Sequence, residues 1–334
     1  MPLSKIQFGN TGRRNLVKNG AMQIAQRGTQ TGQGSGNAYS AVDRFQITSS
    51  GTNGRLTTSQ STDAPAGFSK SLQLVCTTAD TSIAAGEFTR IRHRIEGQDL
   101  QHIEKGTSGA KQVTLSYHAK ASTAGVIIVE FQDADNNRLS SVAHSITTSY
   151  QKFTHTFPAD TTGEIIDSVN TGATISWVLH AGSQYTSGTL GSAFTTGADA
   201  NKAVGQTFSI FAATSRQFNL SGVQLEVGSA ASDFEHRSVG EELALCQRYF
   251  QDLNFNSQGY PPTSGYFHCQ VTFPTTMRAT PTGTITDGSK SGTSGSATIA
   301  TSISESACRV ENQTSGNNAR AYHVNGVLKL DAEL

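Results

Sequence analysis

The sequence predicts an all-β protein, with a jelly-roll β-sandwich followed by one helix and a smaller C-terminal β-domain. Apolar and polar residues alternate with period two through much of the chain, as they do in strands that bury one face. The chain has 33 glycines in 334 residues and only 15% charged residues, against a norm of about 25%. A helical spacing of apolar residues stands out in one segment alone, at 239–251.

The alternation is clearest in four segments, and weaker versions of it occur between them. The four segments are Val113–Ala119, Ile127–Phe131, Phe153–Phe157 and Ile175–Leu179, and further strands are expected at 43–48, 55–60, 71–77, 86–96, 139–147 and 207–213. Turn residues separate these strands at short intervals. Such spacing is typical of an antiparallel sandwich of jelly-roll type.

The last strand of this block changes phase in its middle. Phe218 and Leu220 have even numbers, whereas Val223 and the apolar residues after it have odd ones. A β-bulge at Ser221-Gly222 would produce that shift, because a bulge inserts one extra residue and glycine adopts its backbone conformation without steric strain.

The chain is expected to divide into four parts. They are an N-terminal attachment arm at 1–14, the jelly roll at 15–237, a helical connector at 238–257 and a C-terminal β-domain at 258–334. Ser238 can cap the helix, which carries Leu243, Cys246, Tyr249 and Phe250 on one side. The C-terminal domain has expected strands at Phe267–Phe273, Ala297–Ile303 and Ala321–Leu330, and mobile loops are expected at Gln30–Asn37 and Gly288–Ser296.

The overall composition excludes several classes of partner. Lys and Arg together number 25, as do Asp and Glu, so no global field attracts nucleic acid or an anionic membrane. The first residues contain no apolar stretch of signal-peptide length, and the longest strongly aliphatic run, Val126–Val129, is too short to span a bilayer. The four cysteines form no C-x-x-C pair, so we expect free, mostly buried thiols, which fits assembly in a reducing cell interior.

Three stretches carry a resemblance to a known family. They are Asn15–Gly28 (NLVKNGAMQIAQRG), Gly222–Phe250 with its GVQLEVG and ELALCQRYF motifs, and Phe273–Thr282 (FPTTMRATPT) with the terminal DAEL. The chain resembles phage tail-fibre and virion appendage proteins that carry a carbohydrate-binding-module-like jelly roll. The resemblance brackets nearly all of residues 15–334.

The resemblance implies a structural virion protein that assembles as a homotrimer and contacts a glycan receptor on the host surface. It also implies that the first strand of the sandwich lies beside the last. Family members often have a longer N-terminal attachment region, so tail, neck and capsid all remain open as virion partners. A capsid-attached decoration fibre or a structural connector is one alternative, and a glycan-degrading virion enzyme is another.

The segment 88–96 (FTRIRHRIE) offers the strongest candidate ligand site. Alternation places Arg90, Arg92 and Arg94 on one face of a strand, where they could hold an acidic glycan through paired hydrogen bonds or could simply form a solvated face or a subunit interface. Trp177 alternates in phase with Ile175, which favours a place in the core. The tyrosines expected in loops are better candidates for sugar stacking; they are Tyr39, Tyr185, Tyr260 and Tyr266.

Two further expectations concern cofactors and catalysis. Modules of the carbohydrate-binding kind often hold a structural calcium ion, and Asn19, Asp43 and Glu226 are the nearest matches to its ligands. The sequence contains no G-x-S-x-G, no H-E-x-x-H and no closely spaced acidic pair in an aromatic cleft pattern. We therefore expect a binding protein and not an enzyme.

Overall fold

The computed structural model describes residues 13–260, 265–315 and 321–334, and it divides the chain into two compact units, 1–237 and 238–334. Each unit contains two antiparallel sheets and its own buried apolar cluster. The all-β prediction is confirmed. Most of the expected attachment arm, residues 1–12, lies outside the described residues.

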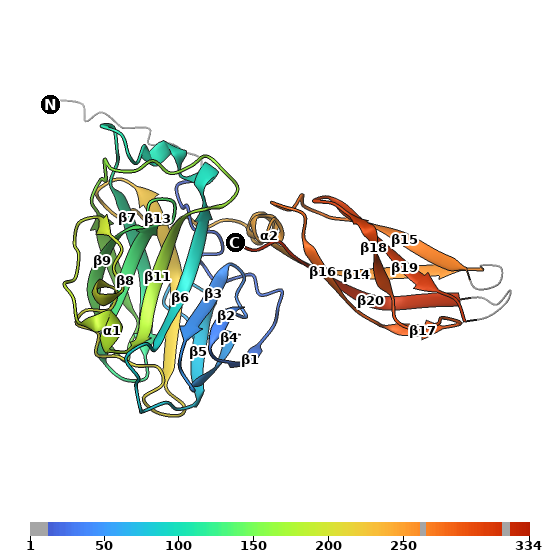
Figure 1. Ribbon diagram of the computed structural model, residues 1–334, viewed down its shortest axis with the longest axis horizontal. Coiled ribbons are helices and arrows are strands. Elements are labelled where there is room, and N and C mark those ends of the chain that lie inside the picture. The colour runs from blue at the N-terminus through green and yellow to red at the C-terminus, as the bar shows by residue number, and fades with distance from the viewer. Residues whose placement is uncertain (1–12, 261–264, 316–320) are drawn as a thin grey trace. The chain divides into compact units, whose positions relative to one another are not determined.

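The first unit is a sandwich of a six-stranded and a seven-stranded sheet, drawn as two layers in Figure 1. The six-stranded sheet has the order β1 (Gln30–Gln33), β4 (Arg55–Ser61), β5 (Ser71–Thr78), β13 (Gln217–Val227), β7 (Val113–Ala121) and β10 (Gln151–Phe157). The seven-stranded sheet has the order β12 (Thr195–Thr196), β9 (Arg138–Ile146), β8 (Gly125–Asp133), β11 (Thr171–Ala181), β6 (Phe88–Glu96), β3 (Phe45–Ser50) and β2 (Gly36–Tyr39).

The core lies between these sheets and follows from the alternation. Ile91, Ile175 and Val129 point inward from neighbouring strands and are completely buried. Trp177 is also 0% exposed, and its ring lies edge-on to Tyr117 with 5.7 Å between centroids. The interpretation of Trp177 as a core residue is confirmed.

The bulge predicted at Ser221-Gly222 is present. The pairing of β13 with β7 shifts between Ser221 and Gln224, and Gly222 has a φ of 60°. The resemblance implied that the first strand would lie beside the last, but β1 pairs with β4. The segment 15–20 lies beside β13 instead, with Leu16 N donating to Leu225 O and Val223 N donating to Gly20 O.

Two other predictions for this unit were wrong. Residues 207–213 form no strand; Phe208, Ile210 and Phe211 are buried, but Phe208 N and Ile210 N donate to carbonyls of β8 and β11. Gln30–Asn37, expected as a mobile loop, contributes the strands β1 and β2 at the sheet edges. Short helical turns complete the unit; they are η1 (Gly97–Asp99), η2 (Gln101–Ile103), α1 (Ser183–Thr186) and η3 (Asp199–Asn201).

The second unit begins with helix α2 (Val239–Gln247), and Ser238 Oγ accepts from Glu241 N as the expected cap. The helix ends before the predicted residue 251, because β14 (Phe250–Gly259) starts there and pairs with β20 (Ala321–Asp331). Of the residues predicted as a helical connector, 250–257 therefore lie in a sheet.

The remaining strands complete two small sheets. β16 (Thr282–Thr286) and β17 (Ser289–Ser291) also pair with β20, while β19 (Ala307–Gln313) lies between β15 (Tyr266–Thr272) and β18 (Thr298–Ile303). β17 falls inside Gly288–Ser296, where a loop was expected. Cys76, Cys246 and Cys308 are buried, Cys269 is half-buried, and all four are free thiols as predicted.

Candidate functional site

The face of the seven-stranded sheet that points away from the core carries the candidate site. On β6, Ile91 and Ile95 point into the core, and alternation therefore directs Arg90, Arg92 and Arg94 to the opposite face. The sequence predicted this arrangement. Arg90 is 9% exposed, whereas Arg92 and Arg94 are half-buried.

The strand register brings polar residues from distant parts of the sequence into one line with Arg92. Residues that pair directly across neighbouring strands share a face and lie about 5 Å apart. We call this line the polar row. Its members, in order across β2, β3, β6, β11, β8 and β9, are Tyr39, Gln46, Arg92, Ser176, Glu130 and Ser141.

Some charged side chains in and beside the polar row have an oppositely charged partner, and others have none in the described part of the chain. Arg90 Nη1 lies 3.3 Å from Glu130 Oε2, while Arg92 makes no hydrogen bond or ion pair with any described residue. Burial raises the pKa of Glu130, although Arg90, Lys202 and Arg92 oppose this shift. Burial, followed by repulsion from Arg90 and Arg94, lowers the pKa of Arg92 to about 9.

Several polar atoms of the row are buried without a hydrogen-bond partner among the described residues. They are Arg92 Nε, Ser176 Oγ, Glu130 Oε1 and Ser141 Oγ. Ser176 is 0% exposed, and Glu130 and Ser141 are each 1% exposed. Buried polar groups in native proteins are nearly always hydrogen-bonded, so these atoms, which solvent does not reach, are exceptions to that rule.

The loop 182–206 covers one end of this face. Phe88, Ile128 and Val178 of the sheet form a small apolar cluster with Ala203 of the loop, and Tyr185 packs on Phe88 with 4.5 Å between ring centroids. Tyr185, predicted as a sugar-stacking residue, is therefore engaged in holding the loop to the sheet.

The other predicted tyrosines have different surroundings. Tyr39 belongs to the polar row, in strand β2 and not in the expected loop, and the Arg27 guanidinium lies 4.8 Å from its ring centroid. Tyr260 and Tyr266 are 72% and 60% exposed and belong to the second unit. They are not part of the polar row.

The residues expected to bind calcium do not form one cluster. Asn19 Nδ2 donates to Ile24 O and Asp43 O, so Asn19 and Asp43 are linked. The Asp43 carboxylate accepts from Gln26, and the Glu226 carboxylate accepts from Ser232 and Gln224. Within 13–260, 265–315 and 321–334, no group of three or more His, Cys, Asp or Glu side chains could hold a metal ion.

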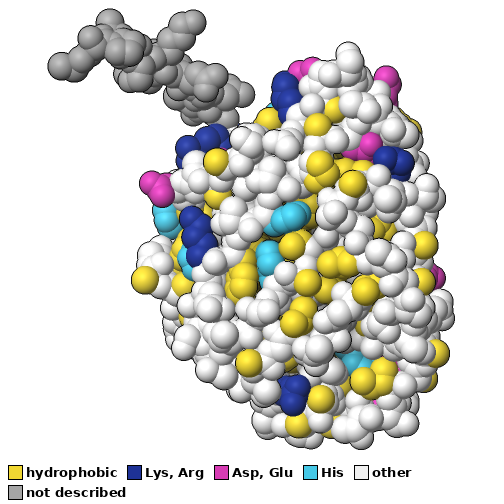
Figure 2. All heavy atoms as spheres, turned by 90° about the vertical axis from the view of Figure 1, so that its left-hand side faces the viewer, with side chains coloured by type: hydrophobic (Ala, Val, Ile, Leu, Met, Phe, Trp, Pro, Cys, Tyr) yellow, Lys and Arg dark blue, Asp and Glu magenta, His cyan; other side chains and the backbone are white. Residues whose placement is uncertain are grey.

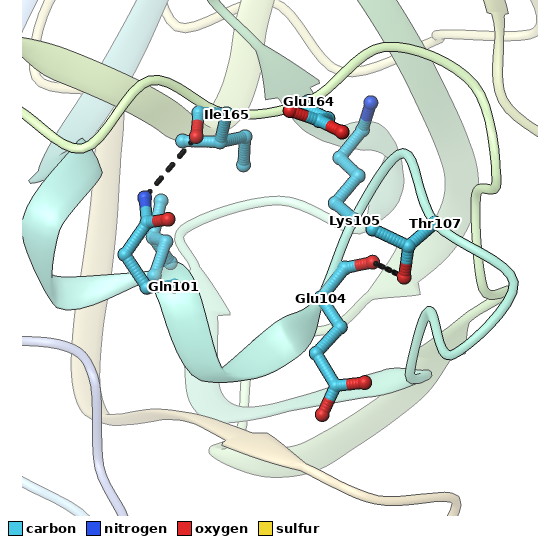
Figure 3. A pocket seen from close by; sticks show the side chains of 7 residues that line it. Gln101, Glu104, Lys105, Thr107, Glu164 and Ile165 are labelled. Atoms are coloured by element: carbon cyan, nitrogen blue, oxygen red, sulfur yellow. Dashed lines mark hydrogen bonds between the residues drawn. The ribbon is translucent and has the colours of Figure 1, made fainter.

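A cavity of about 220 Å³ opens elsewhere in the first unit and is shown in Figure 3. Gln101, Glu104, Thr107 and Glu164 line it, together with Lys105. Thr107 Oγ1 donates to Glu104 O and Gln101 Nε2 donates to Ile165 O.

The charged groups beside this cavity have partners. The Lys105 ammonium group pairs with Asp133 and Asp160, and Glu104 pairs with Lys111. The main cations near this cavity are thus already neutralised.

Three side chains are linked by hydrogen bonds in the order hydroxyl, imidazole and carboxylate, which is the order of a nucleophile, a base and an acid. Ser209 Oγ lies 2.8 Å from His180 Nδ1, and His180 Nε2 lies 2.9 Å from Glu87 Oε2. His180 is completely buried, and Ser209 Oγ also accepts from Phe211 N. These bonds connect the residue before β6, strand β11 and the segment after residue 207, so the three side chains have a structural role.

Another surface of the first unit is rich in aromatic side chains. His144 of β9 stacks on Phe153 of β10 with 5.0 Å between ring centroids, and His155 lies edge-on to Phe157. Figure 2 shows histidine and hydrophobic side chains gathered on the corresponding side of the molecule, with few charged groups between them. This aromatic edge is distinct from the polar row.

Sequence reasoning missed four members of the polar row, namely Gln46, Glu130, Ser141 and Ser176. Each is a polar residue at an outward position of an alternating strand, as Ser176 is between Ile175 and Trp177. Most strands of a sandwich have such residues. The signal that distinguishes these four is their register, which the sequence does not display.

No protein-family model matches the chain, and no curated protein matches it. Solved structures with a similar chain path include a CBM4 carbohydrate-binding module, at 13% identity over 64% of this chain and 99% of that one, with a TM-score of 0.33. A family 11 carbohydrate-binding module of Clostridium thermocellum matches at 9% identity over 60% and 98%, with a TM-score of 0.30.

A domain of bacteriophage CBA120 tailspike protein 4 is also similar, at 12% identity and a TM-score of 0.33. The match covers 64% of this chain and 22% of the tailspike chain. No helix in the described part of the chain has the length and apolar character needed to cross a membrane.

Proposed function

We propose that this chain is a structural subunit of a phage virion appendage and binds a glycan of the host surface through the polar face of its seven-stranded sheet. The observation that carries the binding proposal is the half-buried Arg92 of the polar row, whose guanidinium has no hydrogen bond or ion pair with a described residue. A guanidinium group donates hydrogen bonds, and sugar hydroxyl groups can accept them. The virion role rests on the family resemblance of the three sequence stretches.

Blocking the face tests the binding proposal. Thr48 lies on β3 beside Gln46 and pairs with Arg90, and it is half-buried, so a larger side chain there can project over the row. We expect Thr48→Trp to abolish binding of the intact chain to host-surface polysaccharide, measured by isothermal titration calorimetry. Thr154→Trp on β10 makes the same substitution at an exposed position of the other sheet and is expected to bind normally. Equal binding by both variants would contradict the proposed site.

The place of the protein in the phage needs a different measurement. A low-resolution map of virions carrying a labelled copy is expected to show density on the tail. Density on the capsid shell would favour the decoration-fibre alternative. Sedimentation of the purified chain at micromolar concentration tests the proposed homotrimer, and a monomer there would count against it.

The enzymatic alternative predicts release of oligosaccharides. Incubation of the protein with host polysaccharide is expected to leave the polymer length unchanged. If fragments do appear, Ser209→Ala tests whether the chain of Ser209, His180 and Glu87 produces them.

A further inference from the structure

Arg92 differs from its neighbour Arg90 in having no counter-charge of its own. Arg90 pairs with Glu130, the one carboxylate of the polar row, whereas the Arg92 guanidinium makes no hydrogen bond with a described residue and its Nε atom is buried. A guanidinium group cannot lose its proton at neutral pH. A fixed positive charge therefore lies half-buried in the centre of the row.

The surroundings of Arg92 within the protein make that charge unfavourable. Arg90 and Arg94 repel it, and burial removes part of its hydration. The formal charge of the whole chain is zero, so the excess of positive charge is local to this face. An anion seated on Arg92 would offset both effects through paired, charge-assisted hydrogen bonds.

The accessible groups around Arg92 fit a saccharide that carries such an anion. Ser176 and Glu130, on the next two strands, are 0% and 1% exposed and lie below the surface that a ligand would contact. Tyr39 offers an aromatic ring at the other end of the row. The sole tryptophan, Trp177, is in the core, so the face has no tryptophan for stacking neutral sugars.

From this geometry we infer that the polar face binds an acidic polysaccharide, with a carboxylate or sulfate group of the sugar on the half-buried Arg92. This inference rests on the proposed function and specifies the chemical class of its ligand. It makes Arg92 the residue that determines specificity, because its guanidinium pairs with the anion.

The test compares acidic and uncharged polymers on the intact chain at physiological salt. Polygalacturonate and its carboxyl-reduced form differ only in the carboxylate, and dextran sulfate and dextran differ only in the sulfate. Calorimetry with these four probes on the wild type, Arg92→Gln and Arg92→Lys measures the contribution of the guanidinium. Lys152→Gln, which removes one positive charge from the exposed face of β10, is the matched control.

We expect binding to at least one acidic polymer and not to its uncharged counterpart, and the polymer that binds identifies the anion. Arg92→Gln should weaken binding by about tenfold or more, since a charge-assisted hydrogen bond contributes about 1.5–3 kcal/mol. Arg92→Lys should recover part of the loss, and Lys152→Gln should bind like the wild type. Thermal unfolding should show that Arg92→Gln is folded, because no described residue loses a hydrogen bond.

Failure of this inference is distinguishable from failure of the proposed function. Equal binding of acidic and uncharged polymers, no binding of either acidic polymer, or equal affinities for Arg92→Gln and Lys152→Gln would overturn the acidic specificity. If Thr48→Trp still abolished binding to host polysaccharide, the glycan-binding face would stand. If Thr48→Trp also had no effect, the face itself would be excluded as the site.

Discussion

At Gly222 the bulge of β13 requires a conformation that other residues adopt only with strain. Its φ is 60°, and a Cβ atom there would lie 2.6 Å from Phe68 Cζ and 2.8 Å from His118 Nδ1. We expect Gly222→Ala to lower the free energy of unfolding by about 2–4 kcal/mol, from backbone strain and the clash together. Urea denaturation followed by fluorescence measures this change in the free energy of unfolding.

Gly205 provides the matched control for this prediction. It also has a positive φ, 82°, but a Cβ atom there would have no neighbour within 4 Å. Gly205→Ala should therefore show only the backbone effect, about 1 kcal/mol. Equal losses of unfolding free energy at the two positions would mean that the close contacts of the added Cβ atom with Phe68 and His118 contribute nothing.

Lys105 is a buried cation whose partners depend on it. Its side chain is 3% exposed, and Nζ lies 2.5 Å from Asp133 Oδ2 and 3.1 Å from Asp160 Oδ2. Asp160 keeps Arg138 as a partner when the lysine is removed. We expect Lys105→Met to destabilise the protein by about 3–5 kcal/mol, because Asp133 is left as a buried charge without its counter-ion.

The double variant Lys105→Met/Asp133→Asn tests that reason. Replacing the carboxylate by an amide removes the uncompensated charge, so chemical denaturation should show part of the stability restored. No recovery in the double variant would indicate that the effect comes from lost packing of the lysine side chain and from its lost hydrogen bonds to Thr162 O and Gly163 O.

The surroundings of Arg92 show which contacts could be predicted from the sequence and which could not. Alternation was enough to place Arg92 opposite Ile91, because a strand has period two wherever one face is buried. It could not reveal that Glu130 and Ser176 stand beside Arg92, since that depends on the pairing of strands separated by tens of residues. The position of the arginines on one face of β6 was thus predictable, and the polar row across the neighbouring strands was not.

At the scale of elements, the aromatic edge formed by β9 and β10 links stability to pH. Burial and the nearby His155 lower the pKa of His144 to about 4, and burial also lowers the pKa of His155. In the unfolded chain both histidines take up protons near pH 6.5. The folded state therefore loses stability as the pH falls from about 6.5 towards 4.

We expect His144→Gln to reduce this pH dependence. Glutamine has an acceptor that can replace the imidazole nitrogen beside the Tyr117 hydroxyl but does not titrate. The difference in unfolding free energy between wild type and variant should shrink by about 1 kcal/mol from pH 7 to pH 4.5, a modest value because His144 is partly solvated. A pH-independent difference would contradict the assignment to His144.

Three segments show why some elements could not be predicted. Residues 207–213 are apolar because they are buried at the margin of the sandwich, yet their backbone does not pair as a strand. β1 and β2 have the opposite character, since they pair at sheet edges without an apolar face. Helix α2 ends early because Phe250 pairs with Asp331 in a sheet. In each case long-range pairing overrides the local pattern.

At the scale of the whole molecule, the two units have separate buried apolar clusters. Leu220 belongs to the cluster of the first unit and Leu328 to that of the second, and both are 0% exposed. Each unit also pairs its own strands, since no sheet of the described residues contains strands from both 1–237 and 238–334. The main sources of stability are therefore internal to each unit.

This separation predicts that calorimetry of the intact chain shows two unfolding transitions, as is common for chains with more than one unit. Leu328→Ala should lower the free energy of unfolding of the second unit by about 2–5 kcal/mol, through lost burial and the cavity left behind, and leave the other transition in place. Leu220→Ala makes the same chemical change in the first unit and should shift only the transition that Leu328→Ala spares. A single transition lowered equally by both variants would mean that the units unfold as one.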